Sequence, residues 1–154
     1  MLLALIDTSG QLIELGVAER ESLVAAKRYP HTKPNARDIA ILFSEFLSDS
    51  GISLRSLKYV AMGCGPGTFI GTRTGVSFGN GLAAGLGIRV IGLDTLVCQA
   101  AELLFKDYSP LCVRSARRHS YYAGFYSEDV IESSGDSGRL FEIECQLTEL
   151  DGPL

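Results

Sequence analysis

The stretch GCGPGTFIGTRTGVSFGNGLAAGLG, from Gly63 to Gly87, constrains the fold of this chain more than any other segment. Nine of its 25 residues are glycine, yet the pattern from about Thr72 to Leu86 predicts a helix. Each glycine inside a helix is less favourable than alanine by about 0.5–1 kcal/mol, so several of them require a compensating gain. The usual gain is the close approach of a phosphate, another backbone or a partner.

Two known phosphate-binding motifs do not fit this stretch. A P-loop requires G-x-x-x-x-G-K-[ST], whereas Gly67–Gly71 is one residue too short and Arg73 matches no position of that motif. The run Gly63–Gly67 continues with Thr68 and so fails the dinucleotide fingerprint G-x-G-x-x-G. The N-terminus of a helix still attracts anions, so nucleotide binding by this loop stays an alternative.

The glycines of the predicted helix fall on two ridges. Gly71, Gly75 and Gly79 lie four residues apart on one ridge, and Gly81 and Gly85 lie on another. The other arcs are mostly apolar, which is typical of a helix buried on most sides. We therefore expect one ridge to lie on a sheet and the other against a helix.

The rest of the chain predicts a mixed sheet with helices on its faces. Three strands joined by short links form antiparallel hairpins, and two β-α-β crossovers follow them. The expected strands are Leu2–Thr8, Leu12–Val17, Ser22–Tyr29, Leu57–Met62 and Arg89–Gly92, and the expected helices are Ala36–Asp49 with an Asn35 cap, Thr72–Leu86 and Thr95–Phe105.

The pattern changes after Lys106. Strands are expected at Leu111–Ser115, Tyr121–Tyr126 and Arg139–Leu147, with a loop over Ser127–Gly138. This part is too small to close its own core. The sequence predicts an N-terminal half over 1–106 and a partial second half over 107–154.

The helix Ala36–Asp49 carries more apolar surface than one sheet needs. Its apolar residues fill an arc of roughly 160°, whereas a surface helix needs about 100°. Two interpretations stay open: this helix packs against the glycine-rich helix of its own chain, or both helices offer a face to another subunit. The second interpretation predicts interface residues Ile39, Leu42, Phe43, Phe46, Phe69, Arg73, Gly75, Val76, Gly79 and Leu82, with Phe43, Phe46 and Leu82 as anchors.

The overall charge argues against a freestanding nucleic-acid binder. Fourteen basic and 18 acidic residues give a net charge of −4, whereas such binders usually carry a basic surplus. A subunit whose partner supplies the positive charge remains compatible with this composition.

Cysteine usage and the N-terminus predict a cytoplasmic protein. Cys64, Cys98, Cys112 and Cys145 form no CxxC pair, and three of them sit in apolar runs as buried free thiols do. The opening MLLALIDTSG has no basic segment and is too short an apolar run for a signal peptide or a membrane span.

Asp7 is the strongest candidate for chemistry, because ligands gather at the carboxyl ends of strands in such sheets. A magnesium site would need further converging carboxylates, and none is obvious, so the alternative is that Asp7 accepts hydrogen bonds from the turn Thr8–Gly10. His31 and His119 form no zinc pair, and His31 is expected to order the loop before the first helix. No serine has a nucleophile-elbow context.

A basic cluster of Arg114, Arg117 and Arg118 precedes the aromatic run Tyr121–Tyr126. Arginine beside aromatic residues can hold RNA or an acidic partner. The alternative is a half-buried strand whose arginines pair with local acids.

The run GPGTFIGTRTG from Gly65 resembles the signature of the bacterial tRNA threonylcarbamoyladenosine biosynthesis protein TsaB (YeaZ) family. Other stretches resemble that family in the same order, over roughly residues 1–126: ALIDTSG, His31-Thr32, GNGLAAGLGIRVIGLDTL and VRSARRHSYYAGFY. The resemblance implies an α/β fold of the ribonuclease H-like (actin-like ATPase) class, with a mixed sheet flanked by helices and a second half that is small or truncated here.

The resemblance also implies a non-catalytic scaffold. Members of the family bind the related catalytic subunit TsaD through the two helices of the first half, the ATPase TsaE joins them, and together they transfer a threonylcarbamoyl group to a tRNA adenosine. The same face can form a homodimer. No cofactor is expected on this chain alone, and ATP or ADP at the subunit interface is left open. No membrane contact is expected, and tRNA would be reached through the complex.

The chain departs from the family pattern at several positions. Ile70 replaces a threonine of the family pattern, and Thr72 and Thr74 replace aliphatic residues. Asn80 stands where the family has lysine, Ser115 where it has aspartate and Ser120 where it has glutamate. Family members also continue further through the second half. The alternative function is a stand-alone ATPase or nuclease of the same fold with Asp7 as metal ligand; an endopeptidase has no nucleophile or zinc pair to support it.

Overall fold

The computed structural model describes residues 1–31, 38–104, 110–115, 120–126 and 141–144. It divides into two compact units, Met1–Thr95 and Leu96–Leu154. No helix within the described ranges is long and apolar enough to cross a membrane.

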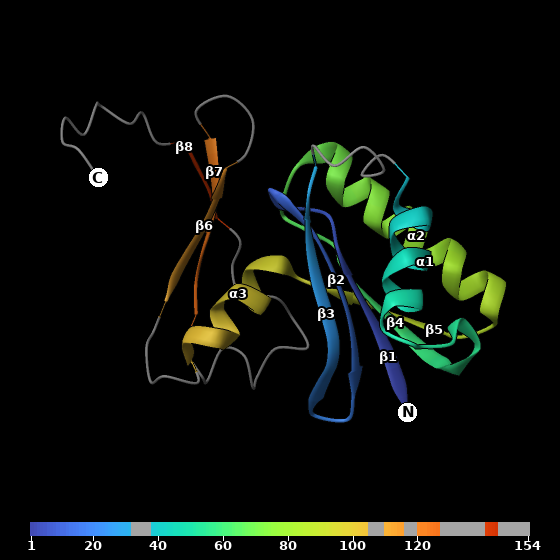
Figure 1. The fold of residues 1–154 in the computed structure, drawn as a ribbon. Coiled ribbons are helices and arrows are strands. Elements are labelled where there is room, and N and C mark those ends of the chain that lie inside the picture. The colour runs from blue at the N-terminus through green and yellow to red at the C-terminus, as the bar shows by residue number, and fades with distance from the viewer. Residues whose placement is uncertain (32–37, 105–109, 116–119, 127–140, 145–154) are drawn as a thin grey trace. The chain divides into compact units, whose positions relative to one another are not determined.

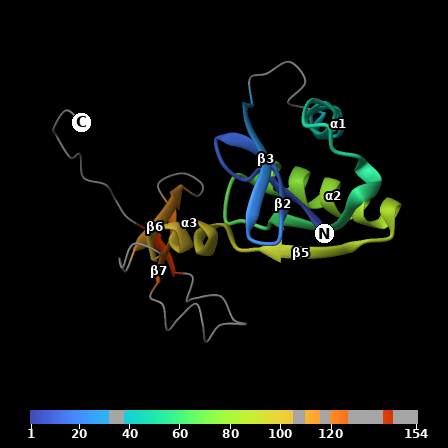
Figure 2. The same ribbon diagram turned by 60° about the horizontal axis from the view of Figure 1, so that its bottom comes forward.

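The first unit is built on a five-stranded mixed sheet (Figure 1). Its strands are β1 (Leu2–Asp7), β2 (Leu12–Glu19), β3 (Ser22–Pro30), β4 (Leu57–Gly63) and β5 (Arg89–Leu93), in the order β3-β2-β1-β4-β5. β1, β2 and β3 pair antiparallel, whereas β1, β4 and β5 run parallel. This topology confirms the predicted hairpins and crossovers. β3 and β5 are the edge strands, and Figure 2 shows β5 along the margin of the sheet.

Three helical elements belong to the connections of this sheet. They are α1 (Ile39–Asp49), the short 3₁₀ helix η2 (Leu54–Ser56) and α2 (Phe69–Leu86). The Asp38 side chain caps α1 by accepting hydrogen bonds from Ala40 N and Ile41 N; the predicted cap Asn35 lies outside the described residues. α2 begins three residues earlier than predicted, because the Thr68 side chain accepts a hydrogen bond from Gly71 N and so caps the helix.

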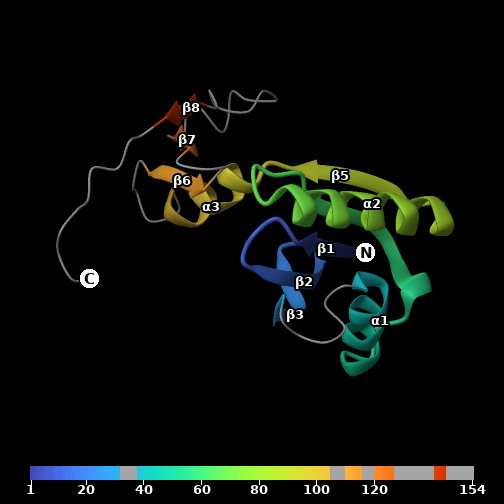
Figure 3. The ribbon, with the colours of Figure 1, turned by 90° about the horizontal axis from the view of Figure 1, so that it is seen from above.

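The core lies between the sheet and the two long helices, which cover the same face (Figure 3). Ile6, Val17 and Val60 come from the strands, and Leu42 and Phe46 come from α1. Alternate residues of each strand point to this face, as the period of a strand requires. α1 is also tied to β3 at its C-terminal end.

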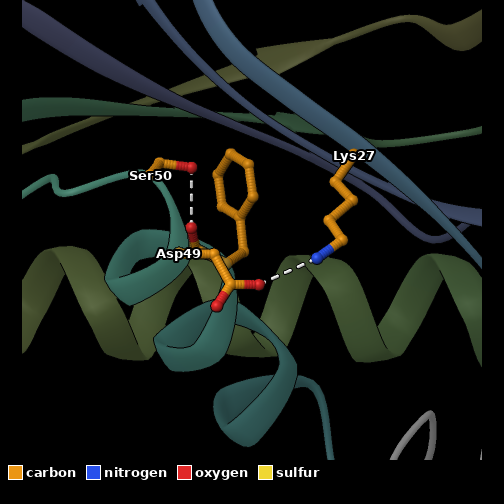
Figure 4. A network of polar contacts seen from close by, with 4 residues as sticks. Lys27, Asp49 and Ser50 are labelled. Carbon is orange, nitrogen blue, oxygen red and sulfur yellow. Dashed lines mark hydrogen bonds and ion pairs between the residues drawn. The ribbon is translucent and has the colours of Figure 1, made fainter.

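That tie is shown in Figure 4. Lys27 Nζ on β3 donates to Asp49 Oδ2 at 2.8 Å, and Ser50 Oγ donates to the Phe46 carbonyl at 2.8 Å. The hydrogen bond that Lys27 donates to Asp49 raises the pKa of Lys27. Both partners of the ion pair are exposed, so solvent screens it and its contribution to stability is small.

The second unit has a small core of its own. α3 (Thr95–Leu104) places Leu96 and Ala100 against Cys112 and Tyr126. β6 (Leu111–Ser115), β7 (Ser120–Phe125) and β8 (Phe141–Glu144) form an antiparallel sheet in that order. The units divide before Leu96 rather than after Lys106, because the apolar residues of α3 pack into this second core. The predicted loop Ser127–Gly138 lies outside the described residues.

The cysteines do not all behave as the sequence predicts. Cys112 is buried, and burial raises the pKa of its thiol. Cys64 and Cys98 are exposed. An apolar run predicts a buried thiol only where both faces of the element are covered.

Candidate interaction surface

The turn between β1 and β2 is held directly against the start of α2. Thr8 Oγ1 donates to the Gly71 carbonyl at 2.5 Å, and Thr68 N donates to the Ser9 carbonyl at 2.8 Å. Both Thr8 and Ser9 are buried. The two backbones therefore touch, and side chains at the contact would separate them.

The first glycine ridge makes this contact possible. A Cβ on Gly71 would overlap the Thr8 carbonyl oxygen, and one on Gly75 would lie 2.5 Å from Thr8 Oγ1. A Cβ on Gly79 would lie 2.8 Å from Met62 Sδ on β4. The expectation that one ridge lies on a sheet is confirmed. Gly75 is buried against Thr8 after β1 and Gly79 against β4, and their assignment to a partner interface stays a prediction.

The second ridge faces open space. A Cβ on Gly81 or Gly85 would have no atom within 4 Å. Of the two neighbours left open for this ridge, a helix of the same chain is not found within the described residues, and a helix of another subunit stays a prediction. α1 contacts a different side of α2, where the Phe43 and Phe78 rings pack edge to face with 5.5 Å between their centroids.

α1 uses its wide apolar arc inside the chain. Ile39, Leu42, Phe43 and Phe46 are 7%, 0%, 2% and 1% exposed. These residues are buried because α1 covers both the sheet and a side of α2; a direct role for them in an interface, with Phe43 and Phe46 as anchors, stays a prediction. The wider arc serves these two internal neighbours. Val76 and Leu82 are partly buried against the same core.

Other predicted interface residues remain on the surface. Phe69 is 51% exposed, and Arg73 lies over its ring with the guanidinium carbon 3.7 Å from the ring centroid. Such a stack holds the guanidinium in place without using its hydrogen-bond donors. Arg73 is thus oriented on the outer side of α2.

Two exposed isoleucines were missed by the sequence analysis. Ile41 on α1 is 45% exposed and Ile70 on α2 is 77% exposed. A signal existed for Ile41, because it is apolar yet falls outside the helical stripe of α1. Ile70 carried the signal of replacing a polar residue of the family pattern.

The outward sides of the two helices combine these apolar residues with small ones. We define the α1–α2 outer surface by its exposed members Ala40, Ile41, Ser44, Ser48, Phe69, Ile70, Arg73, Ser77, Gly81 and Gly85. A groove of about 380 Å³ runs between the helices, with Phe43, Leu47, Phe78 and Leu82 in its walls. Small residues beside an apolar groove allow a further helix to approach closely.

Asp7 accepts a hydrogen bond from the turn after β1, as the alternative to a magnesium site predicted. Its Oδ1 accepts a hydrogen bond from Ser9 N at 2.7 Å. Its carboxylate lies so close to Gly63 that a Cβ there would be 2.7 Å from it. Within the described residues no group of three His, Cys, Asp or Glu side chains is placed to hold a metal ion.

The two histidines are placed differently. His31 Nε2 lies 3.0 Å from the Gly10 carbonyl, so His31 binds the β1–β2 turn. His119, like Arg117 and Arg118, lies outside the described residues. Arg114 lies on β6 opposite Tyr122 and is partly buried.

The aromatic run after the basic cluster is a half-buried strand. Tyr126 is 1% exposed, Phe125 is 60% exposed, and Tyr122 packs against the core of the second unit. RNA contact by Arg114, Arg117 and Arg118 stays a prediction.

Replacing Asp7 with alanine should lower the free energy of unfolding by about 1–2 kcal/mol, because Ser9 N loses a charged acceptor in a partly buried turn. Asp49→Ala is the matched control and should have a smaller effect, since its ion pair is exposed. Urea denaturation of the three proteins measures both values. A stable Asp7→Ala protein that had lost a measurable turnover would instead make Asp7 catalytic.

Comparison with known proteins decides the family. Residues 32–136 match the family described as "TsaD: tRNA N6-adenosine threonylcarbamoyltransferase". The chain is also 30% identical over 146 residues to the tRNA threonylcarbamoyladenosine biosynthesis protein TsaB of Haemophilus influenzae, and 31% identical over 99 residues to that of Escherichia coli. The chain belongs to the TsaB (YeaZ) members of this family. The resemblance stated from the glycine-rich run is confirmed.

The alignments cover more of this chain than of its relatives. The Haemophilus match takes in 92% of this chain and 59% of the relative, and the Escherichia match 63% and 43%. The structure of YeaZ from Pseudomonas aeruginosa superposes with a TM-score of 0.74 at 19% identity, over 99% of this chain and 71% of that one. The predicted ribonuclease H-like (actin-like ATPase) fold is thereby confirmed.

Proposed function

We propose that this chain is a non-catalytic scaffold subunit in tRNA threonylcarbamoyladenosine biosynthesis, which binds a TsaD-like catalytic subunit and holds it in its working conformation. The relatives that carry the TsaB name are proteins of this biosynthesis. The observation that carries the proposal is the α1–α2 outer surface, where exposed apolar side chains border small residues and a groove. Within the described residues the members of this surface are exposed.

The physical support for the proposal is the free energy that a partner would gain by covering that surface. Ile41, Phe69 and Ile70 are exposed large apolar side chains, and covering what remains exposed of each would contribute part of the about 1.5–3 kcal/mol that full burial of such a side chain gives. Gly81 and Gly85 let a helix backbone come close, and the helix of this chain tolerates them only at a loss of stability. A helix of a partner is the element that gains from both features.

The proposal includes further partners. A TsaE-like ATPase would join the pair, ATP or ADP could then occupy the subunit interface, and tRNA would be bound by the assembly. The same outer surface would form a homodimer when the catalytic subunit is absent. The enzyme alternative has no observation in its favour, because the Asp7 carboxylate is engaged by Ser9 N and packed on Gly63.

The test is co-purification with the cognate TsaD-like subunit, followed by a tRNA-modification assay with and without this chain. We expect a stable complex, modification only when both are present, and no ATP hydrolysis or RNA cleavage by this chain alone. Failure to bind the catalytic subunit, or turnover by this chain alone, would reject the proposal.

Charged substitutions locate the interface. Ile70→Glu combined with Ile41→Glu should weaken association by about 30-fold or more, because each change places a charge in an apolar contact. Stability should change by less than about 1 kcal/mol, since both side chains are exposed. Leu23→Glu is the control, because Leu23 is 62% exposed on β3, outside the α1–α2 outer surface. Equal binding by the double variant and the control would place the interface elsewhere.

A further inference from the structure

The charges of this chain are unevenly distributed. The segment from Ser50 to Leu93 contains four basic residues, Arg55, Lys58, Arg73 and Arg89, and no aspartate or glutamate. The whole chain has 18 acidic residues and a net charge of −4. The acidic total therefore conceals a segment with a charge of +4, which supplies η2, β4, α2 and β5.

The fold gathers three of these cations at one end of the sheet. Arg55 lies in η2 directly before β4, and Lys58 is the second residue of β4. Arg89 begins β5 and pairs with Tyr59, the residue after Lys58. Because β4 and β5 are parallel neighbours, their first residues lie at the same edge. We name Arg55, Lys58 and Arg89 the β4–β5 basic edge; all three are exposed.

Three other surface cations of the first unit are paired with acids, whereas no ion pair is found for those of the basic edge among the described residues. Lys27 pairs with Asp49 and Arg28 with Glu14, and the amino terminus of Met1 pairs with Glu19. Among the described residues no ion pair engages Arg55, Lys58 or Arg89. Exposed cations without acidic partners attract a polyanion.

We propose that the β4–β5 basic edge contacts the phosphate backbone of RNA, and that this chain thereby contributes its own tRNA contact to the assembly. The identity of the RNA rests on the proposed function; the contact itself rests on the charge distribution. None of the three residues belongs to the α1–α2 outer surface, although the groove beside that surface extends to Leu54, the neighbour of Arg55. Arginine and lysine bind phosphate oxygens through charge-assisted hydrogen bonds.

An RNA contact has a signature that a protein contact lacks. Each phosphate neutralised by a cation releases counterions, so the logarithm of affinity falls with the logarithm of salt concentration by about 0.7–0.9 per contact. Removing two contacts should lower this slope by about 1.5 and weaken binding several-fold, with little dependence on base sequence.

The experiment compares two double variants that each lose one lysine and one arginine. Lys58→Ala with Arg89→Ala removes cations of the basic edge, and Lys27→Ala with Arg28→Ala removes paired cations of β3. Fluorescence anisotropy measures the binding of unmodified tRNA between about 25 and 200 mM salt, for the full chain alone and for its complex with the TsaD-like subunit. Arg55→Ala is then added to the first variant.

The expected result is a reduced slope and weaker binding for the basic-edge variant, with the β3 variant close to the unmodified protein. Equal slopes for the two variants would overturn the proposal. The absence of tRNA binding by the unmodified full chain at the lowest salt would also overturn it. Loss of the TsaD-like subunit from the basic-edge variant at unchanged tRNA affinity would assign the edge to a protein partner and also reject it. Failure of any variant to form the complex tests the proposed function separately, because the arm with the chain alone still measures RNA binding.

Discussion

Replacing Gly71 with alanine should lower the free energy of unfolding by about 3 kcal/mol or more. The new Cβ would overlap the carbonyl oxygen of Thr8 and crowd Thr68 Oγ1, which caps α2. Backbone atoms cannot rotate away as a side chain can, so either α2 moves off the sheet or the β1–β2 turn opens. Both movements break the hydrogen bond from Thr8 Oγ1 to the Gly71 carbonyl.

The same substitution at Gly81 should have the opposite sign. Nothing lies within 4 Å of a Cβ at this position, so alanine should raise the free energy of unfolding by about 0.5–1 kcal/mol through its better helix propensity. Urea denaturation of both variants and the unmodified chain measures the difference. Destabilisation of similar size at Gly71 and Gly81 would contradict the placement of the first glycine ridge on the sheet.

Replacing Phe46 with alanine should lower the free energy of unfolding by about 3–5 kcal/mol. Phe46 is 1% exposed in the core between α1 and the sheet, and its ring lies 6.4 Å from that of Phe43. Truncation removes apolar burial and leaves a cavity that the surrounding strands cannot fill.

Phe69→Ala is the matched control, because it makes the same chemical change at a side chain that is 51% exposed. It should change the free energy of unfolding by less than about 1 kcal/mol and should weaken association with the TsaD-like subunit instead. Thermal or urea denaturation gives the first value and a pull-down gives the second. A stable Phe46→Ala chain that failed to associate would place Phe46 in the interface.

Local patterns predict most of the architecture. Apolar runs in β1 and β4 indicate strands, and short links indicate hairpins. The register of β1 with β2 and β4 follows from these signals, since a strand shifted by one residue would reverse its faces. The start of α2 was predicted three residues too late, because Thr68 becomes a cap only when the preceding loop places its hydroxyl where Gly71 N can donate a hydrogen bond to it.

Site prediction was less successful for a physical reason that particular residues illustrate. An apolar stripe shows that a side chain is buried, but it does not distinguish an internal neighbour from a partner. Phe43 and Phe69 are the same residue type on two neighbouring helices, and one is buried while the other is half exposed. The basic edge was missed as well, because Arg55, Lys58 and Arg89 are spread over 35 positions and meet only through strand pairing.

Composition and spacing were sufficient for the family, the mixed sheet and the inference that glycines in α2 permit a close approach. Whether the approaching backbone belongs to the same chain or to a partner is decided only by the tertiary structure. Gly71 and Gly75 face the chain's own β1–β2 turn, while Gly81 and Gly85, on the same helix, face open space. Their separation comes from the direction in which α2 lies across β1 and β4, and contacts between segments distant in sequence set that direction.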